Sequence, residues 1–345
     1  GLLLVLIGGW GSLSAQSAGS NYAHQVNTLI GTKGVGLTSG YLYPGATYPY
    51  GMVQFTPSYF SKRSGFVINQ LSGGGCEHMG NFPTFPVKGK LKMSPDNILN
   101  YRINISEEKG HAGYYEAKVQ EDIHAKLTVT ERTGMASYEY PADQQYGTVI
   151  IGGGISATPI DQAAIVITAP NKCEGYAEGG NFCGLRTPYK VYFVAEFDTD
   201  ALESGTWKRD ELKPNTTFAE GEYSGVYFTF DVNKKKNIQY KIGVSYVSVE
   251  NARENLKAEN TGWDFLQIQN QAESKWNHYL GKIEVEGTNP DRTTQFYTHL
   301  YRSFIHPNVC SDVNGEYMGA DFKVHKSRSK HYTSFSNWDT YRTQI

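Results

Sequence analysis

The chain has 345 residues, of which 19 % are charged, and its formal net charge is −2. This balance gives no support for nucleic acid or an acidic substrate as a partner, because both favour basic patches. The 25 tyrosines and 37 glycines favour strands and turns over helices, and the length allows one large domain or two ordinary ones.

The first 16 residues differ in kind from the rest. An apolar run from Leu2 to Ile7 is followed by small residues up to Ala15. This order is typical of the hydrophobic and cleavage regions of a secretory signal, although its charged start and an initiator Met are missing. We expect residues 1–16 to be a signal-peptide remnant, with a buried strand as the alternative. A spanning helix needs about 20 apolar residues, so no membrane span is predicted.

Residues 20–250 have the pattern of a β-sandwich. Apolar side chains alternate with polar ones in several stretches, and this period of two gives each strand one buried and one wet face. Many such strands separated by turn signals are typical of two packed sheets. The alternating apolar positions are Ala125, Leu127, Val129, Val191, Phe193, Ala195, Phe197, Val226, Phe228, Phe230, Val232, Tyr240, Ile242, Val244 and Tyr246.

The period changes after residue 250. Steps of three and four between apolar positions predict a helix within a linker at 251–285. A second helix should begin near Asn289, which can cap it, and Pro290, which suits a first turn, and it should end before Pro307. Residues 286–345 therefore begin a helical domain of which only the first part is present.

Four cysteines, Cys76, Cys173, Cys183 and Cys310, allow three full pairings. In an exported protein, Cys173 and Cys183 could form a local bridge around the nine residues between them. The alternative is four reduced thiols. The spacing does not suggest a zinc site.

Three polar stretches are richer in glycine and polar residues than a sandwich requires: 30–57, 72–86 and 306–342. The second places Cys76, Glu77, His78 and Asn81 within six residues. No third member of a nucleophilic triad is apparent beside its thiol and imidazole. In the third, the segment around Asn314 is better explained as a tight turn than as a calcium loop, because the order of acidic residues does not fit.

The most distinctive cluster is Trp338-Asp339-Thr340-Tyr341-Arg342. Indole faces stack on sugar rings, and carboxylate and guanidinium groups bind neighbouring hydroxyls at two points. The cluster therefore predicts a sugar subsite. The alternative is an Asp339–Arg342 surface pair near a core tryptophan.

Together these stretches resemble the N-terminal part of glycoside hydrolase family 92, the calcium-dependent exo-α-mannosidases. The resemblance rests on "VNTLIGT" from residue 26, "YPGATYPYGMVQFTP" from 43, "GGGCEHMGNFPTFP" from 73, "FYTHLYRSFIHPNVCSDVNGEYMG" from 296 and "SNWDTYRT" from 336. The matches lie in family order along nearly the whole chain. Asn81 is a departure, since many members carry Asp there.

The resemblance implies a mainly β fold: an N-terminal β-sandwich, a helical linker and the first helices of a truncated (α/α)6 barrel. It implies inverting hydrolysis of terminal α-mannosides, often α-1,2-linked, in mannose-containing glycans, by a secreted protein that is periplasmic or held at the cell surface. A calcium ion is expected, with ligands mostly beyond this chain, and no metal ligand is predicted here. The general acid and base are expected downstream of Ile345.

The resemblance also implies a substrate-binding set on this chain. Its members are Trp338, Asp339, Arg342, Cys76, Glu77 and Asn81. We expect them to position the sugar without cleaving the bond. Two other classes remain open, a non-catalytic carbohydrate-binding module and a purely structural β domain. The amphipathic helix after residue 285 argues against both, because neither class needs it.

Overall fold

The computed structural model describes residues 21–32, 40–58, 65–98, 100–101 and 104–333. The predicted signal remnant at 1–16 and the cluster at 338–342 lie outside these residues.

Eight strands form one antiparallel sheet, in the spatial order β1-β2-β3-β4-β9-β16-β13-β14. Their bounds are Ala46–Thr47 (β1), Gln54–Pro57 (β2), Phe66–Val67 (β3), Thr84–Lys88 (β4), Tyr146–Ile151 (β9), Ser224–Asp231 (β16), Glu203–Lys208 (β13) and Glu211–Pro214 (β14). The order mixes early and late strands, so segments far apart in sequence become neighbours.

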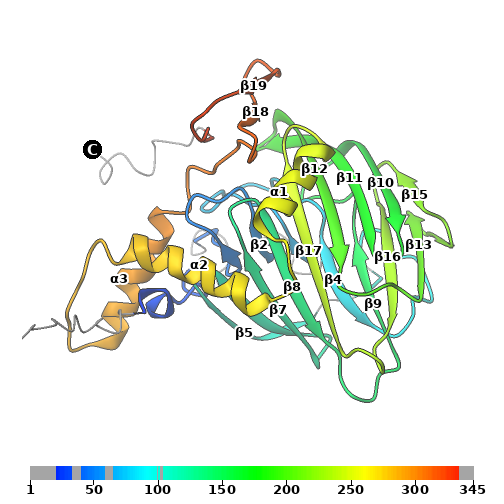
Figure 1. Ribbon diagram of the computed structural model, residues 1–345, viewed down its shortest axis with the longest axis horizontal. Helices are drawn as coiled ribbons and strands as arrows, with labels where there is room; N and C mark the ends of the chain where they lie inside the picture. The colour runs from blue at the N-terminus through cyan, green and yellow to red at the C-terminus, as the bar shows by residue number, and fades with distance from the viewer. Residues whose placement is uncertain (1–20, 33–39, 59–64, 99, 102–103, 334–345) are drawn as a thin grey trace, which may run out of the picture.

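Nine strands form the second antiparallel sheet, in the order β15-β10-β11-β12-β17-β8-β7-β6-β5. Their bounds are Phe218–Glu220 (β15), Ile160–Ala169 (β10), Lys172–Phe182 (β11), Leu185–Phe197 (β12), Asn237–Ser245 (β17), Thr133–Glu139 (β8), Ile123–Val129 (β7), Tyr114–Val119 (β6) and Ile105–His111 (β5). Figure 1 shows the two sheets packed face to face.

The main core lies between the sheets and confirms the predicted sandwich. Phe197 of β12 packs on Phe228 of β16, with ring centroids 4.9 Å apart, and Phe55 of β2 meets Tyr240 of β17 at 6.3 Å. The alternating apolar positions predicted from the sequence are buried, except that Tyr246 is only partly buried. Burial of apolar surface at about 25 cal/mol per Å² is the main force that holds the sheets together.

Helix α1, Val249–Glu259, lies across the outer face of the second sheet over β12 and β17 (Figure 1). Ser248 caps its start by accepting a hydrogen bond from the Asn251 N–H. Gly243 of β17 makes the close approach possible, because a Cβ there would lie 2.5 Å from the Ala252 carbonyl oxygen.

Helices α2, Phe265–Leu280, and α3, Pro290–Ser303, lie beside the sandwich (Figure 1). As predicted, Asn289 caps α3 and Pro290 opens it. Together with the short 3-10 helix η1, Tyr22–Gln25, they enclose a second core. Its fully or nearly fully buried members are Ala23, Val26, Tyr43, Ala112, Trp276, Leu280, Tyr297, Tyr301 and Ile305.

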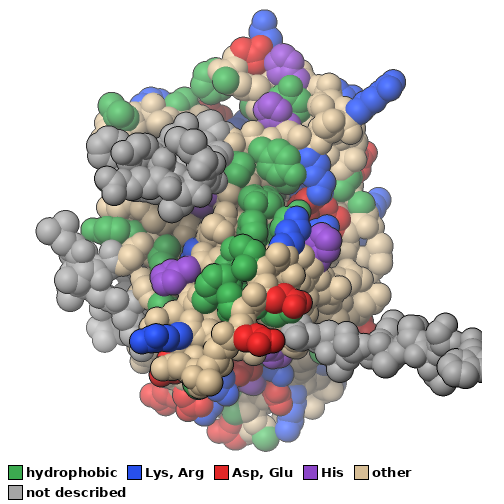
Figure 2. Space-filling view, turned by 90° about the vertical axis from the view of Figure 1, so that its left-hand side faces the viewer, with side chains coloured by type: hydrophobic (Ala, Val, Ile, Leu, Met, Phe, Trp, Pro, Cys, Tyr) green, Lys and Arg blue, Asp and Glu red, His purple; other side chains and the backbone are tan. Residues whose placement is uncertain are grey.

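The apolar side chains of α3 are buried to different extents. Phe296, Leu300 and Phe304, which the sequence places on one side of the helix, pack against the second core but are only partly buried. Tyr297 and Tyr301 lie deeper, and the Tyr301 hydroxyl is 2.8 Å from Thr47 Oγ1. Apolar side chains gather in a strip on this side of the molecule (Figure 2).

The chain continues into a small hairpin, β18 (Glu316–Met318) and β19 (Val324–Lys326). The tight turn predicted at Asn314-Gly315 lies one residue earlier: the Gly315 N–H donates to the Asp312 carbonyl, so Val313 and Asn314 are the central residues, and Gly315 follows them with φ +86°. Within the described part of the chain, every helix is too short or too polar to cross a membrane.

Candidate functional site

The three polar stretches singled out in the sequence meet in the folded chain. The glycine-rich loop between β3 and β4 contacts the first stretch where the Gly73 N–H donates to the Tyr41 carbonyl at 2.9 Å. Gly73 and Gly80 both have positive φ, which glycine adopts without steric cost. The third stretch meets the first where the Val309 N–H donates to the Tyr50 carbonyl at 2.7 Å.

His78 is a buried residue of this loop, and it binds the backbone of Leu71 near the start of the loop. The Leu71 N–H donates to His78 Nε2 at 2.8 Å, and His78 Nδ1 is 2.6 Å from the Cys76 carbonyl oxygen. Because Nε2 must accept, the proton belongs on Nδ1 and the imidazole is neutral. Burial lowers the pKa of His78, and this outweighs the opposing effect of the Cys76 carbonyl.

His306 holds the next residue of the same loop from the other side. The Ser72 N–H donates to His306 Nε2 at 2.9 Å, and His306 Nδ1 lies 2.8 Å from Asn308 Oδ1. Burial lowers the pKa of His306, and the nearby His78 lowers it further. Two consecutive backbone amides are thus held by two neutral imidazoles. We call Leu71, Ser72, His78, His306 and Asn308 the loop cluster.

Asn308 extends the loop cluster to the end of the described chain. Its buried side-chain amide donates to the Gly51 carbonyl at 2.8 Å. Its backbone carbonyl accepts from the Thr333 N–H at 2.8 Å, and its own N–H donates to Thr333 Oγ1 at 3.1 Å. A continuous set of hydrogen bonds therefore joins Ser72 in the glycine-rich loop to Thr333.

Cys76 forms a disulfide with Cys183, with Cα atoms 5.3 Å apart. The Cys173–Cys183 bridge and the fully reduced state considered from the sequence are both wrong. Cys173 is a buried free thiol, and burial raises its pKa. The residues between Cys173 and Cys183 are almost all strand β11, which advances about 3.3 Å per residue and so keeps the two cysteines far apart.

The other predicted binding residues have different surroundings. Glu77 is exposed. Asn81 is only 1 % exposed, and its Oδ1 accepts from Asn69 Nδ2 at 3.0 Å and from the Tyr189 hydroxyl at 2.6 Å. Trp338, Asp339 and Arg342 fall outside the described residues. A sugar-binding role for the whole set stays a prediction.

Asp312 is the most deeply buried carboxylate near this region. It accepts hydrogen bonds from Ser245, Asn251 and Asn255 at 2.6–2.8 Å. Burial raises its pKa, while these donors oppose the rise. With its oxygens occupied by donors from β17 and α1, Asp312 ties the third polar stretch to the sandwich.

Sequence reasoning missed the roles of His78, His306 and Asn308. His78 stood out in the polar stretch, but its partners are a backbone amide seven residues away and a carbonyl two residues away. The Nε2 lone pair of His78 accepts from the Leu71 N–H, and that of His306 accepts from the Ser72 N–H. Neither imidazole can therefore act as a general base in this arrangement. The loop cluster can shape and hold a binding surface.

A separate group of side chains could hold a metal ion. His24, His111 and Glu273 place their ligand atoms within 4.8 Å of one another. Burial would raise the pKa of Glu273, but hydrogen bonds from His111 and Gln269 outweigh it and lower the pKa to about 2. Glu273 is therefore a carboxylate at neutral pH.

Comparison with known proteins places this geometry in a family. Residues 25–245 match the family model described as the glycosyl hydrolase family 92 N-terminal domain, and residues 251–345 match the glycosyl hydrolase family 92 catalytic domain. An uncharacterized secreted glycosidase of Arthroderma benhamiae is 26 % identical over 365 residues, which cover 92 % of this chain and 45 % of that protein.

Solved structures agree with this match. A family GH92 alpha-mannosidase from Bacteroides thetaiotaomicron is 25 % identical and superposes with a TM-score of 0.82 over 93 % of this chain and 46 % of its own. The GH92 inverting mannosidase of Bacteroides thetaiotaomicron VPI-5482 shares the fold, with 23 % identity and a TM-score of 0.75 over 93 % of this chain and 45 % of its own. The chain therefore spans about half the length of these relatives.

Proposed function

Because this chain belongs to glycosyl hydrolase family 92, we propose that it supplies the sandwich side of the mannose-binding site in an exported α-mannosidase. The observation that carries the proposal is the consecutive match of both family domains, along 25–245 and 251–345. The proposed substrates are terminal α-mannosides of glycans, with α-1,2 linkages preferred and with inversion at the anomeric carbon. The secreted relative supports export.

The loop cluster supports a binding role for this end of the sandwich. It holds the glycine-rich loop, with exposed Glu77, against the segment that ends at Thr333. Trp338 follows five residues later, and five residues of chain span at most about 18 Å. This length allows Trp338 and Asp339 to contribute to a sugar site beside the loop, and the proposal has Arg342 keep the Asp339 carboxylate ionised.

We assign this chain to sugar positioning and not to bond cleavage. An inverting glycosidase needs a carboxylic acid and a carboxylate about 6.5–9.5 Å apart, with room for a water molecule between them. Asp312 is enclosed by donors, and the two loop-cluster imidazoles already accept from backbone amides. In line with what the family resemblance implies, the proposal places the general acid and base outside residues 1–345.

The proposal includes a calcium ion, which membership of the family implies. Calcium takes six to eight oxygen ligands. In the described part of the chain, the cluster suited to a metal offers two imidazole nitrogens and one carboxylate, and a hard cation does not favour such donors. This cluster does not fit calcium, so the proposal places most of the calcium ligands elsewhere and assigns no catalytic step to the ion here.

Mannose release tests the proposal. The longer enzyme that contains this chain should release mannose from an α-1,2-mannobioside, lose this activity with a chelator and regain it with Ca²⁺. The 345-residue chain alone should release none under the same conditions. Metal-dependent release by the chain alone would contradict the division of roles and would direct attention to Asp312, Glu316, Asp321 and Asp339. A longer protein that binds mannosides but never hydrolyses them would favour a carbohydrate-binding module.

A further inference from the structure

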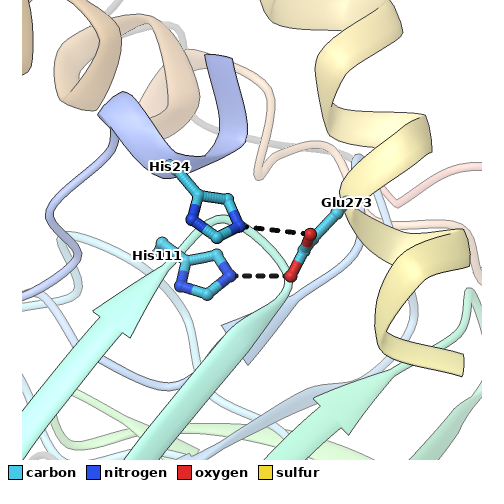
Figure 3. Close-up of side chains that lie close together, drawn as sticks. All are labelled: His24, His111 and Glu273. Carbon is cyan, nitrogen blue, oxygen red and sulfur yellow. Dashed lines mark hydrogen bonds and ion pairs between the residues drawn. The ribbon is translucent and has the colours of Figure 1, made fainter. Parts of the chain in front are cut away.

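Three side chains from distant parts of the sequence converge where the helices meet the sandwich. His24 belongs to η1, His111 ends the edge strand β5, and Glu273 lies in the middle of α2. His24 Nε2 is 3.2 Å from Glu273 Oε2, and His111 Nε2 is 2.8 Å from Glu273 Oε1. Figure 3 shows each imidazole turning one nitrogen toward a separate carboxylate oxygen. We call these three residues the edge cluster.

The backbones that carry the edge cluster are fixed by the second core. Ala23, Ala112 and Ala272, each next to one of the three residues, are all fully buried. The Ala112 N–H donates to the Ala23 carbonyl at 3.3 Å, and the Ala23 N–H donates to Asn277 Oδ1 at 2.7 Å. The site therefore rests on packed elements, which is the arrangement that a pre-organised metal site requires.

A glycine allows α2 to approach the β5–β6 turn. Gly113 has φ +88°, and a Cβ there would lie 2.9 Å from the Ala272 Cβ. Any larger residue would push the helix away and carry Glu273 with it. The close packing of turn and helix thus sets the separation between His111 and the carboxylate.

Surrounding side chains orient the ligands further. Gln269, one turn before Glu273 on α2, donates its Nε2–H to Glu273 Oε1 at 2.7 Å. The Tyr114 ring stacks on His111 with centroids 4.9 Å apart. Partners of this kind hold ligands in position and typically change metal affinity about 10–100-fold when removed.

The donor set matches a borderline divalent metal. A tetrahedral zinc ion has bonds of about 2.0–2.2 Å to nitrogen and oxygen, which puts neighbouring ligand atoms about 3.3 Å apart. One ligand atom from each of the three residues lies within 4.8 Å of the others, so small side-chain rotations bring them to this spacing when bonds to the metal replace the two histidine–carboxylate hydrogen bonds. Two imidazoles and one carboxylate are ligands that zinc takes, whereas calcium and magnesium favour oxygen alone.

We propose that His24, His111 and Glu273 form a Zn²⁺ site, with water at the remaining position. The side chain of His24 is 50 % exposed, whereas those of His111 and Glu273 are 17 % and 12 % exposed, so solvent reaches the site from the His24 side. The ion fastens η1 and the β5–β6 turn to α2, and so joins the sandwich to its first large helix. This site is distinct from the calcium ion in the proposed function.

Zinc titration of the metal-stripped protein tests the site. Calorimetry should show one equivalent of Zn²⁺ bound, and zinc should raise Tm. Co²⁺ in place of zinc should give the visible absorption of a low-symmetry, four- or five-coordinate site. Glu273→Gln and His111→Ala should each weaken zinc binding by at least about 100-fold, because each removes a ligand. His299→Ala, which removes an exposed histidine of α3, is the matched control and should leave affinity unchanged.

The variants distinguish a metal site from three side chains that only form hydrogen bonds with one another. Circular dichroism without zinc checks that each variant folds. If His111→Ala does not fold, His24→Ala replaces it in the test, because the His24 side chain is half-exposed. Absence of one-equivalent binding in the wild-type protein would overturn the proposal. Equal zinc affinity in His24→Ala, Glu273→Gln and His299→Ala would overturn it too. So would displacement of the bound zinc by a small excess of Ca²⁺.

Discussion

The loop cluster and the edge cluster use the same side chain in opposite ways. In the loop cluster, the Nε2 atoms of His78 and His306 accept from backbone N–H groups. In the edge cluster, the Nε2 atoms of His24 and His111 face a carboxylate. The arrangement in the loop cluster needs a neutral imidazole, and its Nε2 lone pair already accepts a hydrogen bond from the backbone. In the edge cluster, each imidazole nitrogen faces a different oxygen of one carboxylate, and one ligand atom from each residue lies within 4.8 Å of the others.

This difference shows that partners decide what a histidine does. An imidazole that accepts from a buried amide is a structural acceptor, because protonation would put two donors face to face. An imidazole that faces a carboxylate can carry a proton or a metal. Changes at one cluster should therefore leave the other intact, and the predictions that follow use this independence.

The largest effect is expected from loss of the disulfide. Cys76 and Cys183 close a separation of 107 residues and tie the glycine-rich loop to the β11–β12 hairpin. The double change Cys76→Ser with Cys183→Ser should lower the free energy of unfolding by about 2–4 kcal/mol. Zinc affinity at the edge cluster should stay the same. Cys310→Ser, at a partly buried free thiol, is the control, with an expected change of about 0.5 kcal/mol or less. Equal effects in both variants would contradict the anchoring role.

A somewhat smaller effect is expected at Asn81. Asn81→Leu leaves Asn69 Nδ2 and the Tyr189 hydroxyl without their acceptor, and should lower the free energy of unfolding by about 2–3 kcal/mol. Asn81→Asp keeps an acceptor for both donors, and burial of its carboxylate offsets part of this gain, so it should cost less than Asn81→Leu. Chemical denaturation measures both values. If Asn81→Asp instead alters kcat/KM for mannosides with little change in stability, Asn81 acts on the substrate.

Acid should weaken the loop cluster gradually. Burial lowers the pKa of His78 and His306 in the folded protein, so the unfolded chain binds these protons more readily. Their contribution to stability is fully present above about pH 6.5, the ordinary histidine value, and is lost as the pH falls through the lowered pKa of the folded state. The slope should not exceed about 1.4 kcal/mol per pH unit for each residue.

Urea unfolding between pH 8 and pH 5 measures this slope. In His306→Gln, the amide oxygen can still accept from the Ser72 N–H but the side chain does not titrate. The variant should therefore lose less stability on acidification than the wild-type protein. An identical pH dependence in both proteins would show that His306 is not one of the groups responsible.

Local patterns in the sequence predicted the sandwich and the helices well. The alternation in β12 and β17 identified their buried faces, and Asn289 with Pro290 located the start of α3. These features depend on neighbours in sequence. The Cys76–Cys183 pair depends on tertiary structure, because the β11–β12 hairpin carries Cys183 to a loop 107 residues earlier.

The loop cluster and the edge cluster were less predictable, because their members also come together only through tertiary structure. Glu273 is 249 residues from His24 and 162 from His111, and on α2 it occupies what looks like an ordinary polar helix position. Ser72 and His306 are 234 residues apart. The density of glycine and polar residues located the stretch that contains Cys76, Glu77 and Asn81, and the family resemblance gave it a binding role, but only the fold reveals which of its atoms already have partners.

The central claim is that this chain positions mannose, and Asp339 tests it most directly. In the longer enzyme, Asp339→Asn keeps the shape of the side chain but replaces an acceptor oxygen with an NH₂ group. A charged hydrogen bond contributes about 1.5–3 kcal/mol, so kcat/KM should fall on the order of 10- to 100-fold while Tm stays the same. Asp339→Ala should cost at least as much, and Asp321→Asn, at an exposed aspartate of the β18–β19 hairpin, should leave kcat/KM unchanged. An unchanged kcat/KM with a lowered Tm in both Asp339 variants would contradict the claim and make Asp339 a structural residue.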